Sequence, residues 1–597
     1  MYLYRQKRKN GDTYLAIKEK YYIPKKGVRD KTIESIGMLS ELKKTLDDPV
    51  AYYTQYAKEL TERAKSERTR TITIDTGCEL PVGANDTRNV GYGALKELYR
   101  ELNLDRFWNW KTRGRRARFS TDQIFRLLTF SRALTPGSKK HTFDTKGFFF
   151  EPFGGFTDDD MYHALDIIAE NSEALQEWVF RESGRLCRRD MSVSYFDCTN
   201  FYFDISRPDV DAPCDAGEPQ TPKYRKRGPE KNHRPDPIIG MGLLMDRNGI
   251  PVAYDLFPGN ESEKVHMRPV IRRASEWNGG GRVIIVADRG LNTSDNIYWV
   301  NGDNKGDSNR CDGYVYGQSV RGADAEMKAW VLGGGYTTDK VASTGDDDDK
   351  VSFMHKSRIH PKVLHVNVPT RGGGTKKKDI PVDQKQMAYY SAKYARRQKA
   401  DRDAMVDRAT DLIAHPKKYD RVTSKGSAAY VKNIEFSKDT GEIIEGRSLE
   451  LDTEKIAEEE KYDGYYCIVT SELAMSDKEI RDAYRGLARI EDSFKVMKTC
   501  FKSRPIYVWL AEHIEAHFAV CFLTLVLIRL LENRLGNKFP AGRILESLRN
   551  YNCVHLDANT WQFTYYDEII DECGKSFGKK LNSRYKTQQE IQRLLRY

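Results

Sequence analysis

Two aspartates stand at the ends of short apolar runs, where they could form one acidic site. Asp197 follows Val193–Phe196, and Asp288 follows the run Val283–Val286 and Ala287. Such runs predict buried strands, and ligand-binding groups in α/β sheets stand at the carboxyl ends of strands. Two carboxylates about 4 Å apart repel by roughly 4 kcal/mol at an effective dielectric constant near 20, so a divalent cation or a shared proton usually holds them together. The residues alone leave open that each aspartate only caps a turn or helix.

A third acidic residue lies on a predicted helix. Between Lys478 and Thr499 the apolar residues have helical spacing, and Tyr484, Glu491 and Lys498 stand seven residues apart. A heptad step drifts by only about 20° around an α-helix, so these three side chains share one face. The face is either an ordinary solvated surface or the polar side of a site. The apolar side of this helix is formed by Leu487, Ile490, Phe494 and Met497.

Positive charge is concentrated in three clusters. Lys and Arg number 98 against 87 Asp and Glu, a formal net charge of +11 that is mild for 597 residues. Clustered cations with interleaved tyrosines are typical of duplex binding, although each cluster alone is also typical of a solvated surface. Cluster 1 is Arg113, Arg115, Arg116 and Arg118; cluster 2 is Lys223, Arg225, Lys226 and Arg227; cluster 3 is Arg396 and Arg397, in a helix predicted over Lys393–Ile413.

The strands that would position the two aspartates form an α/β pattern. The apolar runs Ile238–Met245 and Ile250–Phe257 flank Asp246-Arg247-Asn248-Gly249, a sequence typical of a hairpin turn. A helical stretch over Lys264–Trp277 follows, ahead of the strand before Asp288. The order of three strands, a helix and a strand predicts a mixed α/β core.

Changes of pattern divide the chain into six segments. Gly-rich and acidic loops between 301 and 464 indicate an irregular, β-rich insertion that interrupts the core. Strand character returns at Tyr465–Thr470, followed by the Glu491 helix and a long apolar helix over Ala511–Leu535. We expect a small α+β module (1–80), a helical region (85–190), the first part of the core (191–300), the insertion (301–464), the second part of the core (465–540) and a helical tail (541–597).

Composition limits the class of protein. Hydrophobic residues make up 39% of the chain and aromatic residues 11%, which excludes a disordered tail protein. The longest apolar run, Phe518–Ile528, falls short of the roughly 20 residues that cross a bilayer, and the N-terminus lacks the apolar stretch of a signal peptide. We therefore expect a globular, cytoplasmic protein that contacts no membrane.

Taken together, the motifs resemble those of insertion-sequence transposases of the DDE class. Tyr195-Phe196-Asp197-Cys198-Thr199, Val286-Ala287-Asp288-Arg289-Gly290 and the helix with Glu491 are similar to their Asp, Asp, Glu triad. The similar subgroup has the signature Tyr, two residues, Arg, three residues, Glu, six residues, Lys. Tyr484, Glu491 and Lys498 satisfy it, and Leu487 stands in the Arg position. A large β-rich insertion before the Glu matches the 203-position separation of Asp288 and Glu491.

The resemblance implies a fold and a chemistry. The fold would be α/β, with an RNase H-like mixed-sheet catalytic core, a β-rich insertion and a helical N-terminal DNA-binding region. Asp197, Asp288 and Glu491 would be the catalytic residues and the ligands of two Mg²⁺ ions, which Mn²⁺ can replace. Tyr484, Lys498, Arg289 and the three clusters would contact double-stranded DNA, and Trp330 would either stack on a displaced base or belong to the core.

The implied activity is transposition, with two alternatives. The protein would bind the terminal inverted repeats of its own insertion sequence, cleave the ends by two-metal-ion hydrolysis and join the 3′-OH to target DNA. It would act as a homodimer or higher oligomer. The alternatives are a metal-dependent nuclease of the same core without strand transfer, and a non-catalytic DNA-binding repressor derived from a transposase.

Overall fold

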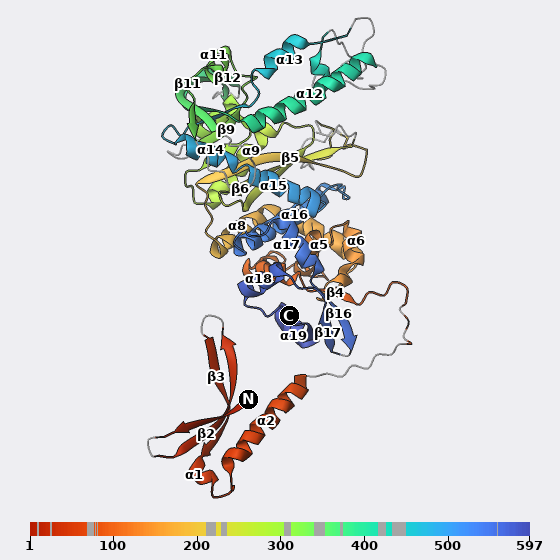
Figure 1. Cartoon of the computed structure of the whole chain (residues 1–597). Helices are drawn as coiled ribbons and strands as arrows, with labels where there is room; N and C mark the ends of the chain where they lie inside the picture. Colours follow the sequence, from red (N-terminus) through yellow and green to blue (C-terminus); the bar gives the residue numbers. More distant parts are fainter. Residues whose placement is uncertain are drawn as a thin grey trace. The chain divides into compact units, whose positions relative to one another are not determined.

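The computed structural model is a mixed α/β structure with a large mixed sheet and many helices (Figure 1). The chain divides into two compact units. Unit 1 comprises Met1–Asp86 with His555–Thr560, and unit 2 comprises Thr87–Val554 with Trp561–Tyr597. The structure describes residues 1–8, 11–23, 27–68, 77, 79, 81–210, 223–228, 236–303, 312–339, 353–369, 374–415, 426–432, 449–557 and 559–596.

Unit 1 contains a three-stranded antiparallel sheet with a helix packed on one face. Leu15 and Ile17 of the central strand are buried, as is Ala57 of the long helix. These contacts join α2 to the sheet. The elements, with the strands in sheet order, are β1 (Tyr2–Lys7), β2 (Thr13–Ile23), β3 (Gly27–Met38), α1 (Leu39–Leu42) and α2 (Pro49–Arg68).

The centre of unit 2 is a nine-stranded mixed sheet with the order β10-β11-β12-β15-β9-β8-β5-β6-β7. Strand β5 pairs in parallel with β8 and antiparallel with β6, and β8 pairs in parallel with β9. The strands are β5 (Val193–Tyr202), β6 (Ile238–Asp246), β7 (Pro251–Pro258), β8 (Ile284–Ala287), β9 (Gly313–Gln318), β10 (Thr337–Asp339), β11 (Phe353–Pro369), β12 (Thr375–Tyr390) and β15 (Tyr465–Thr470).

The predicted hairpin is confirmed as β6 and β7. Gly249 adopts φ +81°, a conformation that glycine tolerates best, and Asp246 accepts hydrogen bonds from the backbone N–H groups of Asn248 (3.0 Å) and Ile250 (2.9 Å). The predicted helix before β8 is also confirmed, as α9 (Glu263–Trp277). The turn chemistry read from the sequence therefore forms this hairpin.

Strand β5 is longer than predicted, so Asp197 lies inside a strand. Its antiparallel pairing with β6 continues to Tyr202, whereas its parallel pairing with β8 ends at Phe196 opposite Ala287. The expectation that Asp197 closes its strand is therefore wrong. Asp197 instead marks the point where β8 stops pairing with β5.

Alternate side chains of the sheet enter two separate cores. Tyr195 and Phe201 of β5 belong to the larger core, which includes α16 (Ala511–Arg534), whereas Phe196 belongs to a second core with α9. This alternation follows from the two-residue period of a strand. We call the side of the sheet that faces α16 the α16 face.

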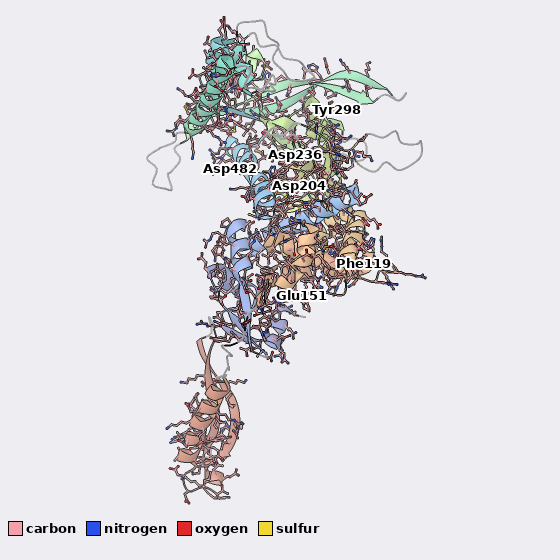
Figure 2. All side chains as sticks on the ribbon, turned by 90° about the vertical axis from the view of Figure 1, so that its right-hand side faces the viewer. Phe119, Glu151, Asp204, Asp236, Tyr298 and Asp482 are labelled. Atoms are coloured by element: carbon pink, nitrogen blue, oxygen red, sulfur yellow. The ribbon has the colours of Figure 1, made fainter. Side chains whose placement is uncertain are left out.

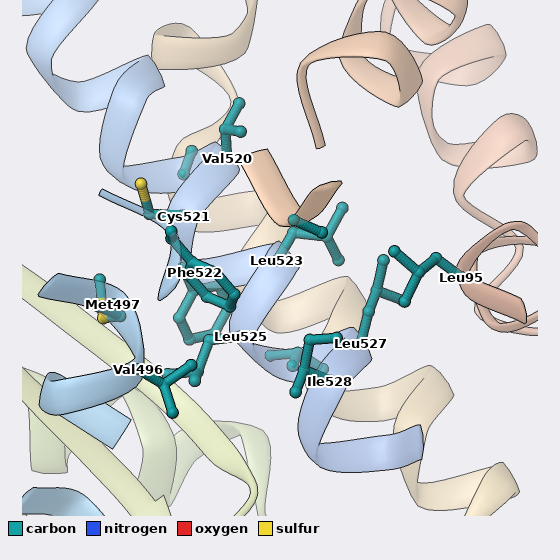
Figure 3. Close-up of a cluster of buried hydrophobic side chains, with 14 of the residues drawn as sticks. Leu95, Val496, Met497, Val520, Cys521, Phe522, Leu523, Leu525, Leu527 and Ile528 are labelled. Atoms are coloured by element: carbon teal, nitrogen blue, oxygen red, sulfur yellow. The ribbon is translucent and has the colours of Figure 1, made fainter. Parts of the chain in front are cut away.

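Helix α16 is the central helix of the larger core. It contacts the helices of the N-terminal helical region and strand β7, and Figure 3 shows its side chains facing Leu95 on one side and Val496 on another. The helices around it are α3 (Gly93–Glu101), α4 (Leu104–Lys111), α5 (Thr121–Leu134), α6 (Lys139–Asp144), α7 (Asp158–Glu170), α8 (Ser172–Leu186) and α17 (Ala541–Asn550). Residues 93–186 thus pack on a helix that follows them by more than 300 positions.

An ion-pair group ties these helices to the loop after α6. Glu151, labelled in Figure 2, accepts a hydrogen bond from Lys96 at 2.7 Å and one from Arg126 at 2.6 Å. All three side chains are largely or fully buried. Because buried charges require partners, this group fixes how α3 and α5 meet.

One helix among the described residues, α16, is long and apolar enough to cross a membrane, which corrects the estimate from Phe518–Ile528. The helix has 24 residues, and 89% of its most apolar window is buried inside the protein. Polar residues such as Glu515 and His517 interrupt the apolar run without ending the helix. Its burial is that of a core helix.

The segment predicted as an insertion is continuous with the central sheet. Strand β9 pairs in parallel with β8, and β12 pairs with β15, so strands from residues 301–464 extend the core sheet at one edge. Strands β11 and β12 form a long antiparallel ribbon. The helix predicted over Lys393–Ile413 is confirmed as α12 (Ala392–Ala414), and α13 (Thr453–Glu460) precedes β15. The acidic loop of this segment, at residues 346–349, lies outside the described residues.

The tail predicted to be helical also contains strands. Strands β16 to β18 join β4 in a four-stranded sheet, because Asn552 and Val554 pair with Asn89 and Thr87. These short, mixed-polarity strands give little periodic signal in the sequence. The elements are β4 (Thr87–Asn89), β16 (Asn552–Asp557), β17 (Thr560–Phe563), α18 (Glu568–Phe577), β18 (Tyr585–Thr587) and α19 (Gln588–Leu595).

Candidate active site

The strand register places Asp197 and Asp288 side by side. Phe196 of β5 pairs with Ala287 of β8, so the two aspartates are the next residues along adjacent parallel strands. Neighbouring strands lie about 4.8 Å apart. Val286 enters the α16-face core and Ala287 the other, so the alternation carries both aspartates toward the α16 face. The predicted juxtaposition of these two residues is confirmed.

Each aspartate is oriented by a local hydrogen bond. Asp197 Oδ1 accepts from the backbone N–H of Cys198 at 2.8 Å, and Asp288 Oδ1 accepts from that of Arg289 at 2.6 Å. Asp288 is exposed and caps the 3₁₀ turn Arg289–Leu291, whereas Asp197 is half-buried. Asp288 therefore acts as a cap, which was the alternative interpretation, and its place beside Asp197 is unaffected.

The predicted helix over Lys478–Thr499 is real but interrupted. It consists of α14 (Asp477–Arg485), α15 (Ala488–Lys495) and a π-helical turn, Val496–Cys500. Between α14 and α15, the backbone N–H of Leu487 donates to the carbonyl of Tyr484 and that of Arg489 to the carbonyl of Gly486. Bonds to the third residue back are those of a 3₁₀ turn. The expected single helix is thus wrong in detail, because tight packing on β5 and β9 alters its winding.

Gly486 sits at that break for a steric reason. A Cβ at this position would lie 2.0 Å from the hydroxyl oxygen of Tyr195, so only glycine lets the helical segment approach β5 this closely. Leu487, in the position of the signature Arg, is 7% exposed and belongs to the α16-face core. It contributes packing here.

Tyr484 forms a hydrogen bond with Asp288, a contact that the sequence analysis did not predict. Its hydroxyl donates to Asp288 Oδ1 at 3.3 Å and forms a second hydrogen bond with the hydroxyl of Tyr466 at 2.6 Å. Burial and the neighbouring Tyr466 raise the pKa of Tyr484 far above its ordinary value, and burial raises the pKa of Tyr466 to about 12. Tyr484 therefore keeps its proton at neutral pH and remains a hydrogen-bond donor to the carboxylate.

Lys498 reaches the opposite side of Asp197. Its ammonium group donates to the hydroxyl of Thr199 and lies 5.4 Å from the ring centroid of Phe201. Thr199 follows Asp197 by two residues on the same face of β5. Tyr484 is thus bonded to Asp288, and Lys498 to a residue two positions from Asp197, whereas the DNA contacts expected of both side chains stay a prediction.

Glu491 lies between these two residues in sequence, on the exposed flank of α15. Helix α15 packs on β5, and Glu491 is solvent-exposed beside the buried Ile490. Within the described part of the chain, no group of three or more His, Cys, Asp and Glu side chains is arranged to hold a metal ion. The structure thus places Asp197 and Asp288 on adjacent strands. The role of Glu491 as a third metal ligand stays a prediction.

The aspartate pair fits a hard divalent cation in its donor chemistry. Carboxylate oxygens are the ligands that Mg²⁺ prefers. The hydrogen bonds from Cys198, Arg289 and Tyr484 each go to one oxygen of these two carboxylates.

Sequence reasoning missed the residues that support Tyr484. Gly317 of β9 lies under its hydroxyl, where a Cβ would approach the oxygen to 2.4 Å. Asn292 donates to the backbone oxygen of Gly317 at 2.9 Å, and Tyr466 contacts Tyr484 from β15. Thr199 could have been found from the two-residue alternation after Asp197, but Gly317 and Tyr466 give no local signal.

The three basic clusters differ in how many of their cations form ion pairs or hydrogen bonds with other residues of the protein. The cluster 1 arginines are exposed in the loop between α4 and α5, where Arg115 forms an ion pair with Glu170. In cluster 3, Arg396 and Arg397 are exposed on α12, with Arg397 at 4.0 Å from Asp401. Arg289, beside the site, is also exposed.

Cluster 2 is partly folded into the protein, which the sequence does not indicate. Arg225 forms a hydrogen bond of 2.7 Å with the carboxylate of Asp209, and the ammonium of Lys226 donates to the backbone oxygen of the same residue at 3.0 Å. Lys223 and Arg227 are exposed. The Asp209 carboxylate therefore pairs with the charge of Arg225, and Lys226 is held by a backbone oxygen, whereas the DNA contacts expected of this cluster stay a prediction.

Trp330 is half-buried on α11 (Ala325–Leu332) and packs against the second core. The guanidinium carbon of Arg358 lies 4.6 Å from the centroid of its ring, and the ammonium of Lys356 lies 5.2 Å from it. These two cations flank the ring, in agreement with the interpretation of Trp330 as part of the core.

Comparison with known proteins yields only distant likenesses. No protein-family model and no curated protein matches the chain. Two solved structures are similar over 40% of this chain and 63% of theirs. One is a Mos1 transposase paired-end complex with the left transposon end (12% identity, TM-score 0.11), and the other a Mos1 mariner paired-end complex with Mn (13% identity, TM-score 0.10). The chain thus spans less than two thirds of each Mos1 chain, and these TM-scores do not define its fold.

Proposed function

We propose that the protein is a DDE transposase whose RNase H-like core is formed by β7-β6-β5-β8-β9. The observation that carries the proposal is the parallel register of β5 and β8, which puts Asp197 beside Asp288. Tyr484 contacts one of these strands and Lys498 the other, at the spacing of the transposase signature. A helix that served only for packing would not require polar side chains at both of these positions.

Asp197, Asp288 and Glu491 would hold two Mg²⁺ ions, which supply an activated water and stabilise the leaving oxygen during phosphodiester cleavage. The residues of the chain do the positioning. Asp197 is fixed by the strand and Asp288 by the turn that it caps. Tyr484 keeps its proton and donates to Asp288, which holds that carboxylate in one orientation.

Lys498 would bind a phosphate of the DNA end. Its ammonium lies on the same face of β5 as Asp197, two residues along the strand, so a phosphate near Asp197 is within reach of the same side chain. A lysine ammonium binds phosphate as a point charge with several donors. Arg289 is exposed next to Asp288 and would contact the backbone on the other side.

The DNA would be duplex, in the form of the ends of the element and of the target. Cluster 1, cluster 3 and the two exposed cations of cluster 2 supply charge for non-specific contacts. We propose that the active complex is a homodimer or higher oligomer, because joining two element ends requires two sites.

The test is a cleavage and joining assay with duplex DNA taken from the regions that flank the gene. Asp197→Asn, Asp288→Asn and Glu491→Gln should each reduce cleavage in Mg²⁺ by several orders of magnitude while DNA binding persists. Asp482→Asn is the matched control, because Asp482 (labelled in Figure 2) is exposed on α14 and, two residues from Tyr484, lies on a different side of the helix. Activity of the triad variants equal to that of Asp482→Asn would contradict the proposal.

The same assay separates transposition from simple hydrolysis. A pre-cleaved end with a free 3′-OH should become joined to a second duplex in the presence of Mg²⁺. Cleavage without joined product would identify a nuclease of this core, and binding without cleavage would identify a repressor.

A further inference from the structure

Helix α2 packs on one face of the sheet of unit 1; on the other face Ala16 is buried, the side chains around it are half-buried, and Arg8 and Lys20 are exposed. Leu15 and Ile17 are buried with Ala57 of α2, and Glu34, which pairs with Ile17 across β2 and β3, forms a hydrogen bond with Tyr56 of α2. The α2 side of the sheet therefore carries the odd-numbered residues of β2 from Leu15 to Ile17. Side chains of Ala16 and Lys18 point the other way.

The face opposite α2 carries tyrosines and cations in alternating cross-strand positions. Tyr2 pairs with Lys18 and Tyr4 with Ala16 in the β1–β2 register, so these residues share one face. Each of the three cations there lies over a tyrosine ring: Lys18 over Tyr4 (3.3 Å to the centroid), Arg8 over Tyr14 (4.9 Å) and Lys20 over Tyr2 (5.3 Å). We call Tyr2, Tyr4, Arg8, Tyr14, Lys18 and Lys20 the Tyr–cation face.

Charge in the first 38 residues, which form the three strands and their connections, is strongly unbalanced. Residues 1–38 contain ten Lys and Arg against four Asp and Glu. Of the acids, Glu34 lies on the α2 side, and Asp30, opposite Lys20, forms a hydrogen bond with Tyr2. Glu19 lies on the α2 side by the alternation of β2, and Asp12 accepts a hydrogen bond from Ser40, so the three cations of the Tyr–cation face share it with Asp30. The rings hold the cations in place, which lowers the entropy cost of binding an anion.

We propose that the Tyr–cation face binds the phosphate backbone of duplex DNA, as a second contact independent of the catalytic site. The choice of DNA as the polyanion rests on the proposed function. A sheet face fits this partner because β-ribbons and sheets can enter the grooves of a duplex, and because cations two residues apart on a strand can contact successive phosphates. The contact positions the protein and reads no sequence, since cations on phosphates carry no base information.

The experiment measures binding of the full chain to a duplex oligonucleotide of arbitrary sequence across a salt series. Chelator is present, so catalysis plays no part. Replacing the three cations together (Arg8→Gln, Lys18→Gln, Lys20→Gln) should lower the slope of log K against log salt by about 2.7, at roughly 0.9 per phosphate contact. The matched control (Lys43→Gln, Lys44→Gln, Lys58→Gln) removes the same charge from exposed positions of unit 1 outside the face and should leave the slope within a few tenths.

A charge-conserving variant separates binding from folding. Arg8→Lys with Lys18→Arg and Lys20→Arg should keep the wild-type slope; a loss equal to that of the Gln variant would show that the residues only stabilise the sheet and would overturn the proposal. An unchanged slope in the Gln variant would also overturn it, as would a change confined to single-stranded RNA. Failure of the transposase proposal has a different signature, because loss of cleavage in Asp197→Asn leaves these slopes untouched.

Discussion

Replacing Gly317 with alanine should displace Tyr484 from Asp288. A Cβ at position 317 would lie 2.4 Å from the Tyr484 hydroxyl oxygen and 3.1 Å from the backbone nitrogen of Arg289, whereas ordinary contact begins near 3.4 Å. Tyr484 must therefore move by about 1 Å. Its hydroxyl cannot do so freely, because it is hydrogen-bonded to Asp288 and Tyr466.

The cost follows from the two interactions that are disturbed. Overpacking a filled position costs about 1–3 kcal/mol. A hydrogen bond to a charged group contributes roughly 1.5–3 kcal/mol, although water can replace part of it at the exposed Asp288. We expect Gly317→Ala to lower the free energy of unfolding by about 1–3 kcal/mol. Cleavage should fall further, because a misplacement of about 1 Å in an active site can cost roughly 100-fold.

A double-mutant cycle measured by urea unfolding tests this reasoning. Tyr484→Phe removes the oxygen that the new Cβ meets and leaves the Arg289 backbone nitrogen at 3.1 Å and a ring atom at 3.2 Å, which a shift of a few tenths of an ångström relieves, so the alanine should cost less than about 1 kcal/mol in that background. Gly290→Ala, with open space around its Cβ, is the control and should be nearly neutral. Equal effects of Gly317→Ala in the two backgrounds would refute the steric account.

Three further predictions concern other parts of unit 2. Lys498→Ala should reduce cleavage by at least tenfold, whereas Lys478→Ala, on the same helical segment outside the signature, should have little effect; equal losses would show that helical register does not place Lys498. Neutralising the four arginines of cluster 1 should lower the log K against log salt slope by up to about 3.6, equally for element ends and unrelated duplex, and a loss of end preference at constant slope would place them on bases instead. Burial lowers the pKa of Lys139 to about 7, with the nearby Arg132 contributing, so the unfolded chain binds a proton that the folded chain lacks between pH 7 and about 10. Wild-type stability should therefore rise in this range by up to about 1.4 kcal/mol per pH unit relative to Lys139→Met, and identical pH dependences of urea unfolding would contradict the assignment.

Local patterns predicted the elements that carry the candidate site. These elements are the turn Asp246–Gly249, the helix before β8 and the apolar helix α16. Each can be predicted because its signal lies within a short stretch of sequence. The pairing of Asp197 with Asp288 could be inferred because parallel strands align their carboxyl ends. Alternation within β5 could also have indicated Thr199.

Long-range packing decided what the sequence could not show. The 3₁₀ break at Gly486 lies against Tyr195, nearly 300 positions away in the sequence. Tyr484 of α14 is supported by Gly317 of β9 and Tyr466 of β15, which are also distant in sequence. Asp209 neutralises part of cluster 2 through contacts that no charge count reveals. Likewise, β9 joins the core sheet because it pairs with β8, although loop signals around it favoured a separate insertion.

The central claim is that Asp197 and Asp288 together hold a divalent cation, and direct Mn²⁺ binding tests it without any DNA. Titration of the full chain followed by electron paramagnetic resonance should show Mn²⁺ bound to the wild type and to Asp482→Asn. Asp197→Asn and Asp288→Asn should each lower the affinity at least tenfold, and Mg²⁺ should compete for the same site. Unchanged Mn²⁺ affinity in both aspartate variants, with the fold intact, would contradict the account.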